Sequence, residues 1–291
     1  MSKRNTIPQA KRWVVKIGSA LLTNDGKGLD AVAIAGWVKQ MAELRLRGIE
    51  LVLVSSGAVA AGMRRLGWAA RPTEIHQLQA AAAVGQMSLI QTYEVEFQRY
   101  GLLTAQVLLD HDDLSSRQRY LNARSTLKTL VGFNVVPVIN ENDTVTTEEI
   151  RFGDNDRLAA RVAQAAGAAG VVLLSDVDGL FDRAPHLPDA MLLPTVEKID
   201  GRVRVMVAEG SSSGMGSGGM ASKLDAADIA TRAGIGLVIA SGLRDHPLLA
   251  LEQGGAATFF FFFFAATEVV ARVPTRTFSS SMNSETSANS R

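Results

Sequence analysis

Residues 12–19 read RWVVKIGS, a short apolar run that contains one lysine and closes on a glycine and a serine. The run is rich in β-branched residues and too short for a helix, so it predicts a strand over Arg12–Ile17. Five further runs of this kind follow at Glu50–Val54, Leu103–Leu109, Val135–Ile139, Val171–Leu174 and Leu237–Ala240. Because these runs are apolar almost throughout rather than alternating, we expect strands covered on both faces, as in a parallel sheet flanked by helices.

Longer segments with helical spacing lie between the predicted strands. They span Asp30–Arg47, Thr73–Tyr100, Ser116–Val131, Asp154–Ala166 and Met220–Ala233. A glycine stands where each helix is expected to end, at Gly48, Gly101, Gly132, Gly167 and Gly234. The regular alternation of strands and helices predicts a layered α/β fold.

The composition is that of a globular protein without cysteine chemistry. Of the 291 residues, 47% are hydrophobic, and 30 Lys and Arg against 29 Asp and Glu give a formal net charge of +1. This charge argues against a protein that coats nucleic acid. The absence of cysteine excludes disulfides, thiolate metal sites and cysteine nucleophiles. Since no segment has the apolar length of a signal peptide or a membrane span, we expect a cytoplasmic protein without membrane contact.

Small and polar residues follow four of the predicted strands. They form the clusters Gly18-Ser19, Ser55-Ser56-Gly57, Asn140-Glu141-Asn142-Asp143 and Ser175-Asp176. In open α/β sheets, ligands bind beyond the carboxyl ends of the strands, and glycines there let backbone N–H groups approach phosphate oxygens. The clusters predict a ligand site that spans several strand ends; the alternative is that they are ordinary loops, which are rich in the same residues.

Two lysines stand where an anionic ligand would need positive charge. Lys16 lies inside an apolar strand, from which it either reaches solvent at the sheet edge or meets an anion. Lys223 lies in the first turn of a predicted helix, behind the glycine-rich segment 214–219. That segment matches G-x-G-x-x-G but follows a serine run instead of a strand. We interpret it as an anion-binding loop rather than a dinucleotide fingerprint, with a plain linker as the alternative.

Other catalytic templates are absent from the sequence. There is no G-x-x-x-x-G-K-[ST] phosphate loop and no H-E-x-x-H zinc pair, and the segment Asp154-Asn155-Asp156 lacks the glycine and glutamate of a calcium loop. We therefore expect no metal site built by the protein. Lysines, glycine-rich loops and aspartates, without a histidine or cysteine nucleophile, fit direct phosphoryl transfer, in which the protein mainly positions and neutralises the reacting groups.

Eight motifs extend this interpretation over most of the chain. In chain order they read VVKIGSALLT, VSSGAVAAGM, QAAAAVGQ, LNARSTL, PVINENDTV, FGDNDRLAA, LLSDVDGLF and GMGSGGMASKLDAADIA. From about Arg12 to about Gly254, the sequence resembles the amino acid kinase family in the order and spacing of these motifs. The resemblance implies a three-layer αβα sandwich around a mostly parallel central sheet of eight strands.

Within that family, the motifs are similar to those of enzymes that phosphorylate the γ-carboxylate of L-glutamate with ATP to give L-glutamyl 5-phosphate, the first step of proline biosynthesis. The resemblance implies L-glutamate and ATP as substrates, Mg²⁺ with ATP as cofactor, proline as feedback inhibitor and assembly into dimers or tetramers. It implies no nucleic-acid partner. Two alternatives stay open: another amino acid kinase, acting on acetylglutamate, aspartate or a nucleoside monophosphate, and a catalytically weak module that senses nucleotides or amino acids.

The resemblance also assigns roles to residues of this sequence. Lys16 and Lys223 would flank the moving phosphoryl group, and Asp156 would orient them. The residues expected to bind the amino-acid substrate are Ser56, Gly57, Asp143, Asp154 and Asn155. The residues expected to bind ATP are Lys16, Gly18, Ser19, Ser175, Asp176, Ser217, Gly218, Gly219, Met220, Ala221, Ser222 and Lys223.

The expected domain organisation has three parts. Residues 1–11 are an N-terminal extension, residues 12–258 an amino acid kinase domain, and residues 259–291 an atypical tail of phenylalanines and polar residues. Many family members continue into a PUA domain; we expect none here, and interpret the tail as a truncated or frame-shifted terminus. Exposed, the segment Phe259–Phe264 would be prone to aggregate. The segment Thr144–Phe152 predicts a partly exposed hairpin near the substrate site.

Overall fold

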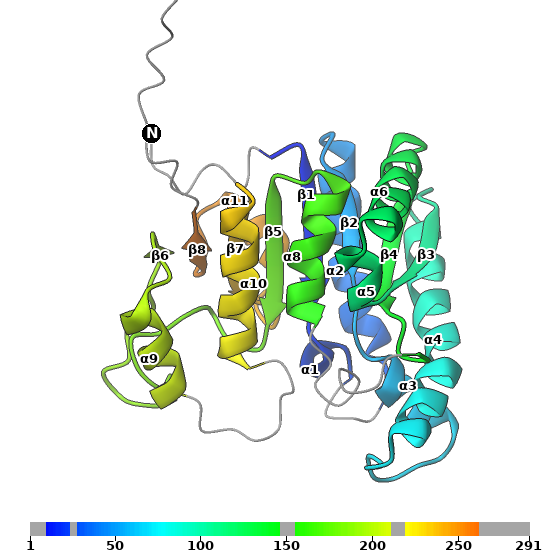
Figure 1. Cartoon of the computed structure of the whole chain (residues 1–291), viewed down its shortest axis with the longest axis horizontal. Helices are drawn as coiled ribbons and strands as arrows, with labels where there is room; N and C mark the ends of the chain where they lie inside the picture. Colours follow the sequence, from blue (N-terminus) through cyan, green and yellow to red (C-terminus); the bar gives the residue numbers. More distant parts are fainter. Residues whose placement is uncertain (1–9, 24–27, 146–154, 211–218, 262–291) are drawn as a thin grey trace, which may run out of the picture.

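The computed structural model describes residues 10–23, 28–145, 155–210 and 219–261. An eight-stranded sheet lies at the centre, in the order β3-β4-β2-β1-β5-β7-β8-β6 (Figure 1). The strands are β1 (Arg12–Ile17), β2 (Glu50–Val54), β3 (Thr104–Leu109), β4 (Val136–Glu141), β5 (Gly170–Ser175), β6 (Thr195–Val196), β7 (Gly236–Ser241) and β8 (Thr258–Phe260). Neighbouring strands are parallel except β7 and β8, so the sheet is mostly parallel, as predicted.

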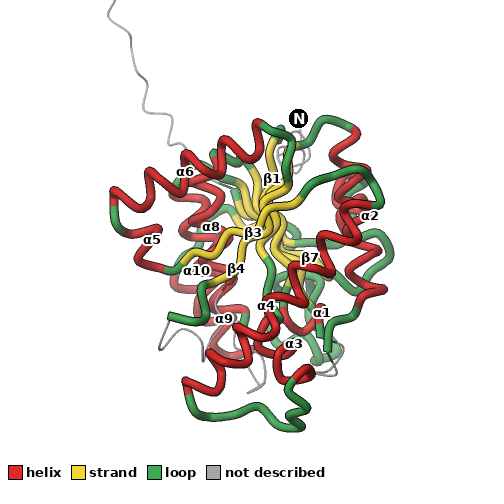
Figure 2. Tube along the Cα trace, turned by 90° about the vertical axis from the view of Figure 1, so that its right-hand side faces the viewer, coloured by secondary structure: helices red, strands yellow, loops and turns green. Residues whose placement is uncertain are grey.

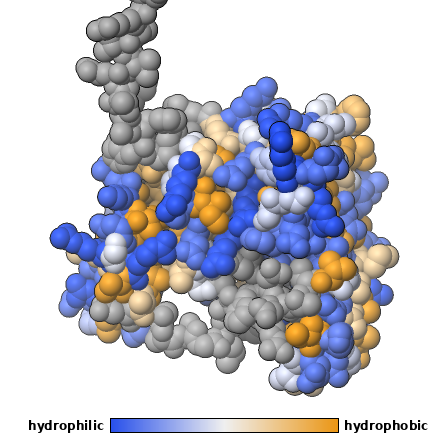
Figure 3. All heavy atoms as spheres, in the orientation of Figure 1, coloured by the Kyte–Doolittle hydropathy of each residue, from blue (hydrophilic) through white to orange (hydrophobic). Residues whose placement is uncertain are grey.

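Helices cover both faces of the sheet and complete three layers (Figure 2). One face carries α1 (Ser19–Leu22), α2 (Ala31–Leu46), α3 (Ala58–Arg65), α4 (Ile75–Gln98) and α11 (Pro247–Glu252). The other face carries α5 (His111–Ser115), α6 (Arg117–Gly132), α8 (Asn155–Ala166), α9 (Gly201–Gly210) and α10 (Met220–Arg232). On the face drawn in Figure 3, hydrophilic residues predominate and hydrophobic residues are scattered among them, as is usual for the water-facing side of amphipathic helices. Within the described residues, no helix is both long enough and apolar enough to cross a bilayer.

Each central strand supplies side chains to two hydrophobic cores, one on either side of the sheet. In β1, Trp13, Val15 and Ile17 belong to the core beneath α2 and α4, whereas Val14 belongs to the core beneath α8 and α10. Successive side chains of a strand point to opposite faces, so a doubly covered strand needs apolar residues at nearly every position. Lys16 lies two residues after Val14 in the strand, so its side chain points to the same face of the sheet, which α8 and α10 cover.

The structure confirms the predicted fold class together with six strands and five helices, whose ends shift by at most two residues. The apolar runs do not predict the short strands β6 and β8, nor the helices α1, α3, α5, α9 and α11. The prediction that Gly132 follows the end of its helix is wrong. Gly132 is the last residue of α6, and Asn134 takes the left-handed conformation instead, with φ of 64°. Asparagine tolerates this conformation better than most side chains.

Strand β8 brings two residues of the phenylalanine run into the sheet. It pairs antiparallel with β7 and parallel with β6. Phe259 and Phe260 are 1% and 0% exposed, and they join the cores on opposite faces of the sheet. The domain end expected at residue 258 therefore falls inside β8, and these two rings are buried rather than available for aggregation. Phe262 and the residues that follow it lie outside the described residues.

The order of the strands places a crevice at the carboxyl end of β1. From β1 the chain moves first to β2 on one side and later to β5 on the other. Where the chain connections from neighbouring parallel strands run in opposite directions, the loops separate and leave room for a ligand between them. The loops after β1, β2, β4 and β5 all meet at this edge, and they carry the polar clusters predicted to form the site.

Candidate active site

A buried cluster of two lysines and one aspartate lies at the end of β1. Lys16 Nζ is 2.6 Å from Asp156 Oδ1, and Lys223 Nζ is 3.1 Å from Asp156 Oδ2. The exposed fractions of Lys16, Lys223 and Asp156 are 5%, 7% and 1%. Two ammonium groups from distant parts of the chain thus share one carboxylate, and the cluster as a whole stays positive.

Three elements bring the cluster together. Lys16 comes from β1, Asp156 is the second residue of α8, and Lys223 lies in the first turn of α10. Helices α8 and α10 pack against each other, and Arg157 Nη2 donates to Asp225 Oδ2 between them at 2.7 Å. Because Lys16 points to the face that these helices cover, the three charged groups converge.

Asp156 is ionised because of its two partners. Burial is the largest single effect and would raise the pKa of this carboxyl, but the charges and hydrogen bonds of Lys16 and Lys223 together hold the pKa below its ordinary value of 3.8. The carboxylate in turn holds two ammonium groups in a buried place where their mutual repulsion would otherwise be strong. The cluster is therefore a preformed partner for an anion with several oxygen atoms.

A network of amides connects the cluster to the neighbouring strand ends. Asn155 opens α8, and its Nδ2 donates to Ser55 O at 2.6 Å and to Ser56 Oγ at 2.9 Å. The same Nδ2 lies 3.0 Å from Asn140 Oδ1, and Asn140 Nδ2 donates to Gln86 Oε1 at 2.8 Å. Within the described part of the chain, the buried Asn155 Oδ1 has no hydrogen-bond partner. Buried polar atoms are rarely left unpaired, so this oxygen is placed to accept a hydrogen bond from a ligand.

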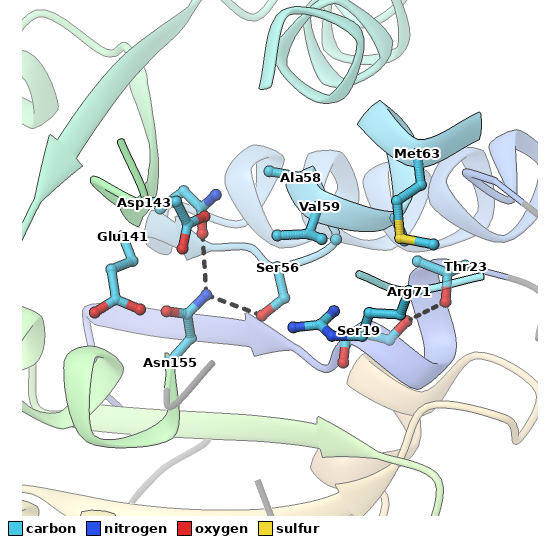
Figure 4. A pocket seen from close by; sticks show the side chains of 13 residues that line it. Ser19, Thr23, Ser56, Ala58, Val59, Met63, Arg71, Glu141, Asp143 and Asn155 are labelled. Atoms are coloured by element: carbon cyan, nitrogen blue, oxygen red, sulfur yellow. Dashed lines mark hydrogen bonds between the residues drawn. The ribbon is translucent and has the colours of Figure 1, made fainter. Parts of the chain in front are cut away.

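A cavity of about 250 Å³ lies beside this network (Figure 4). Pockets that bind drug-sized ligands have volumes of roughly 300–1,000 Å³, so this cavity suits a smaller metabolite. Of the predicted substrate residues, it brings together Ser56, Gly57, Asp143 and Asn155. The remaining lining residues are Ser19, Thr23, Ala58, Val59, Ala60, Met63, Arg71, Asn140 and Glu141.

Asp143 supplies the cavity with a titratable carboxylate. Burial raises the pKa of this group to about 6, while the positive charge of Arg71 opposes the rise. At pH 7 and above, the carboxylate is mostly ionised and can hold an ammonium group. The cavity therefore offers charge complementarity to one end of an amino acid.

Two glycines, Gly57 and Gly18, lie where the backbone borders the site. Gly57 precedes α3 with φ of 93°, a left-handed conformation that side chains other than glycine adopt at a cost. Gly18 precedes α1, and its N–H donates to Leu174 O at 3.1 Å. A Cβ added to Gly18 would lie 3.9 Å from Lys16 Nζ. The missing side chain thus leaves space next to the lysine for part of a ligand.

On the other side of β1, the residues expected to bind nucleotide lie at the end of β5 and the start of α10. Ser175 closes β5, and its Oγ donates to Asp176 Oδ1 at 3.0 Å. The start of α10 contains Gly219, Met220, Ala221 and Ser222, followed by Lys223. N–H groups at a helix N-terminus bind phosphate oxygens favourably. The expected site residues that lie outside the described part are Asp154, Ser217 and Gly218; the hairpin segment is described only at Thr144 and Val145.

Sequence reasoning misses several residues of the site. Thr23 and Arg71 line the cavity, although no motif marks the segment around Arg71. Gln86 reaches the amide network from the middle of α4, far from any strand end. Asn140 belongs to a predicted strand-end cluster, but its contact with Asn155 depends on how β4 and α8 pack. Among the described residues, no group of three or more histidine, aspartate or glutamate side chains is arranged to hold a metal ion.

Comparison with known proteins gives one family for most of the chain. Residues 11–241 match the family model described as the amino acid kinase family. A glutamate 5-kinase of Methylococcus capsulatus is 60% identical over 243 residues, which are 83% of this chain and 65% of that protein. A glutamate 5-kinase of Ectopseudomonas mendocina is 57% identical over 252 residues, which are 86% of this chain and 68% of that protein. The chain thus spans about two thirds of the length of these curated relatives.

A solved structure shares the architecture at low sequence identity. The crystal structure of UMP kinase from Ureaplasma parvum superposes with a TM-score of 0.59 at 15% identity, covering 86% of this chain and 98% of that one. At this identity the likeness concerns the fold alone. It agrees with the three layers and the mostly parallel sheet described above.

Proposed function

The chain belongs to the amino acid kinase family, and from that premise we propose that it transfers the γ-phosphoryl group of ATP to the γ-carboxylate of L-glutamate. The products would be L-glutamyl 5-phosphate and ADP, in the first step of proline biosynthesis. The observation that carries the proposal is the pair of ammonium groups that share Asp156 at the strand end beside an amino-acid-sized cavity. Identities of 60% and 57% to curated glutamate 5-kinases support this choice of acceptor.

The proposed reaction needs no general base, because the γ-carboxylate is already ionised at neutral pH. One of its oxygens attacks the γ-phosphorus in line and forms a new O–P bond. The bond from the γ-phosphorus to the bridging oxygen breaks, and its electron pair leaves with ADP. Lys16 and Lys223 stabilise the charge on the transferred and leaving oxygens, while Asp156 holds both lysines in position.

The two substrates would occupy opposite sides of β1. L-Glutamate would bind in the cavity through Ser56, Gly57, Asp143, Asp154 and Asn155, with its α-ammonium group at Asp143. The ATP phosphates would lie along Gly18, Ser19, Lys16 and Lys223, and the rest of the nucleotide along Ser175, Asp176, Ser217, Gly218, Gly219, Met220, Ala221 and Ser222. This arrangement directs the γ-carboxylate and the γ-phosphate toward the lysine cluster.

Mg²⁺ would enter with ATP. Magnesium in such sites is held largely by substrate phosphates, one or two carboxylates and water. The donors around Lys16 and Lys223 suit phosphate oxygens rather than a cation, so the ion would sit on the nucleotide. When bound, it neutralises charge on the β- and γ-phosphates.

The wider biology of the chain is also part of the proposal. We expect a cytoplasmic homo-oligomer, dimer or tetramer, that proline inhibits and that has no nucleic-acid or membrane partner. Sedimentation with and without proline would measure the assembly, and proline titration of the activity would measure the inhibition.

An assay that couples ADP release to NADH oxidation tests the proposed reaction. We expect turnover with L-glutamate and Mg-ATP, and a kcat/KM at least tenfold lower with N-acetyl-L-glutamate, L-aspartate or UMP, because the cavity offers Asp143 to a free ammonium group. Faster turnover of one of those acceptors would replace the proposed substrate. Nucleotide binding without turnover of any acceptor would instead favour a sensing module.

A further inference from the structure

One cation faces the amino-acid cavity from its rim. Arg71 lies in the segment between α3 and α4, and its guanidinium points into the cavity (Figure 4). Among the described residues that line the cavity, the other charged side chains are Glu141 and Asp143, both of them carboxylates. Within that lining, Arg71 is therefore the one source of positive charge.

An L-glutamate molecule would bring three charged groups into this cavity. Its γ-carboxylate must face the phosphoryl group, on the side of Ser56 and Asn155, because the next residue, Asp156, holds the lysines. Its α-ammonium group suits Asp143. The α-carboxylate then needs a partner, and a guanidinium offers a carboxylate two parallel N–H donors in a planar fork.

We infer that Arg71 determines acceptor specificity by binding the α-carboxylate of the amino acid. The inference rests on the proposed glutamate kinase activity and adds to it a residue outside the eight sequence motifs. Arg71 and Asp143 together would recognise a free amino acid, one through its carboxylate and the other through its ammonium group. Both residues line the same cavity, and the charge of Arg71 lowers the pKa of Asp143 against the effect of burial.

L-Isoglutamine tests the contact directly. It replaces the α-carboxylate with an uncharged carboxamide and keeps both the γ-carboxylate and the α-ammonium group. In the wild type, we expect kcat/KM with L-glutamate to exceed that with L-isoglutamine by roughly 10- to 100-fold, as for the loss of a hydrogen bond between charged groups. In Arg71→Met, kcat/KM with L-glutamate should fall by a similar factor, mainly through KM, while the value with L-isoglutamine changes by less than about threefold.

Two further variants separate recognition from other roles of the arginine. Arg64→Met removes a nearby exposed arginine that does not line the cavity, and it should leave both acceptors unaffected. Arg71→Lys keeps the charge beside Asp143 but loses the planar fork, so kcat/KM with L-glutamate should stay at least about threefold below wild type. Arg71 is itself exposed, so Arg71→Met should keep the thermal unfolding midpoint of the wild type, which circular dichroism measures.

Several outcomes would overturn the inference. Equal losses with both acceptors in Arg71→Met would mean that Arg71 acts on Asp143 or on the fold. Wild-type activity of Arg71→Met or Arg71→Lys with L-glutamate would remove the arginine from recognition, while the proposed kinase activity would stand. If the wild type turns over neither acceptor, the proposed function fails and the inference falls with it.

Discussion

Asp143→Asn should make the protein more stable at neutral pH and less able to bind L-glutamate. Burial raises the native pKa of this carboxyl from 3.8 to about 6, so folding becomes less favourable once the group loses its proton. Each pKa unit corresponds to about 1.4 kcal/mol, and the whole shift therefore to about 3 kcal/mol. Because Asp143 is only partly buried, solvent screening reduces the expected gain in the free energy of unfolding to roughly 1–2 kcal/mol.

The pH dependence of this gain has a definite sign. A raised native pKa leaves the stability contribution of Asp143 fully present below the unfolded pKa of 3.8 and removes it as the pH rises through about 6. The asparagine variant does not ionise. The difference in the free energy of unfolding between variant and wild type should therefore grow from about pH 4 to about pH 6 and level off above about pH 7.

Urea titrations followed by tryptophan fluorescence would measure this difference, since Trp13 and Trp37 are buried. Asp189→Asn, at an exposed position outside the cavity, controls for the loss of one negative charge. The same Asp143 variant should raise the KM for L-glutamate at least about tenfold, because an amide offers no charge to an ammonium group. A stability difference that is constant across the pH range, or that shrinks as the pH rises, would refute the reasoning.

The lysine cluster and the helix packing give three more expected outcomes. Lys16→Ala or Lys223→Ala should lower kcat roughly 100- to 1,000-fold in the ADP-release assay with a smaller change in the KM for L-glutamate; a variant near the wild-type kcat would remove that lysine from the mechanism. Asp156→Asn should lower the free energy of unfolding by about 3–5 kcal/mol, because two buried ammonium groups lose their carboxylate. Since the pKa of Asp156 is lowered, this loss should be present above about pH 4 and shrink as the pH falls further. Urea titrations that give the same loss in the free energy of unfolding above and below about pH 4 would contradict it. Gly62→Ala should destabilise the fold by about 2–3 kcal/mol, because a Cβ there would lie 1.7 Å from a carbonyl oxygen of α4; thermal unfolding measures this, and Gly36→Ala, with no atom within 4 Å, is the control that should not destabilise.

Local sequence patterns suffice for the central strands and long helices, because burial on both faces requires apolar residues at nearly every position of a central strand. They fail for β6 and β8, which are too short to show a period. Strand β8 pairs with the preceding strand β7 and with β6, and at this place the sheet requires only apolar side chains on both sides. The phenylalanine run meets that requirement at Phe259 and Phe260.

The arrangement of the candidate site could be predicted where a motif contains its residues, and not where the packing of distant segments brings residues to the cavity. The motifs indicate Lys16, Asp156 and Lys223, and the structure places both ammonium groups within 3.1 Å of the Asp156 carboxylate. The motifs give no indication of Arg71, because its place at the cavity depends on the path of the chain between α3 and α4. That path is set by a close helix contact, where even a methyl group at Gly62 would not fit.

Strand β1 lies between the two halves of the sheet, and the residues of the amino-acid cavity and those proposed to bind nucleotide come largely from different parts of the chain. Apart from Asn155, every residue that lines the cavity comes from before residue 145. Apart from Lys16, Gly18 and Ser19, the residues proposed to bind nucleotide come from Ser175 onward. In the proposed reaction, substitutions in the first half of the chain could therefore change which acceptor is bound, while the residues proposed to bind nucleotide from Ser175 onward stay the same.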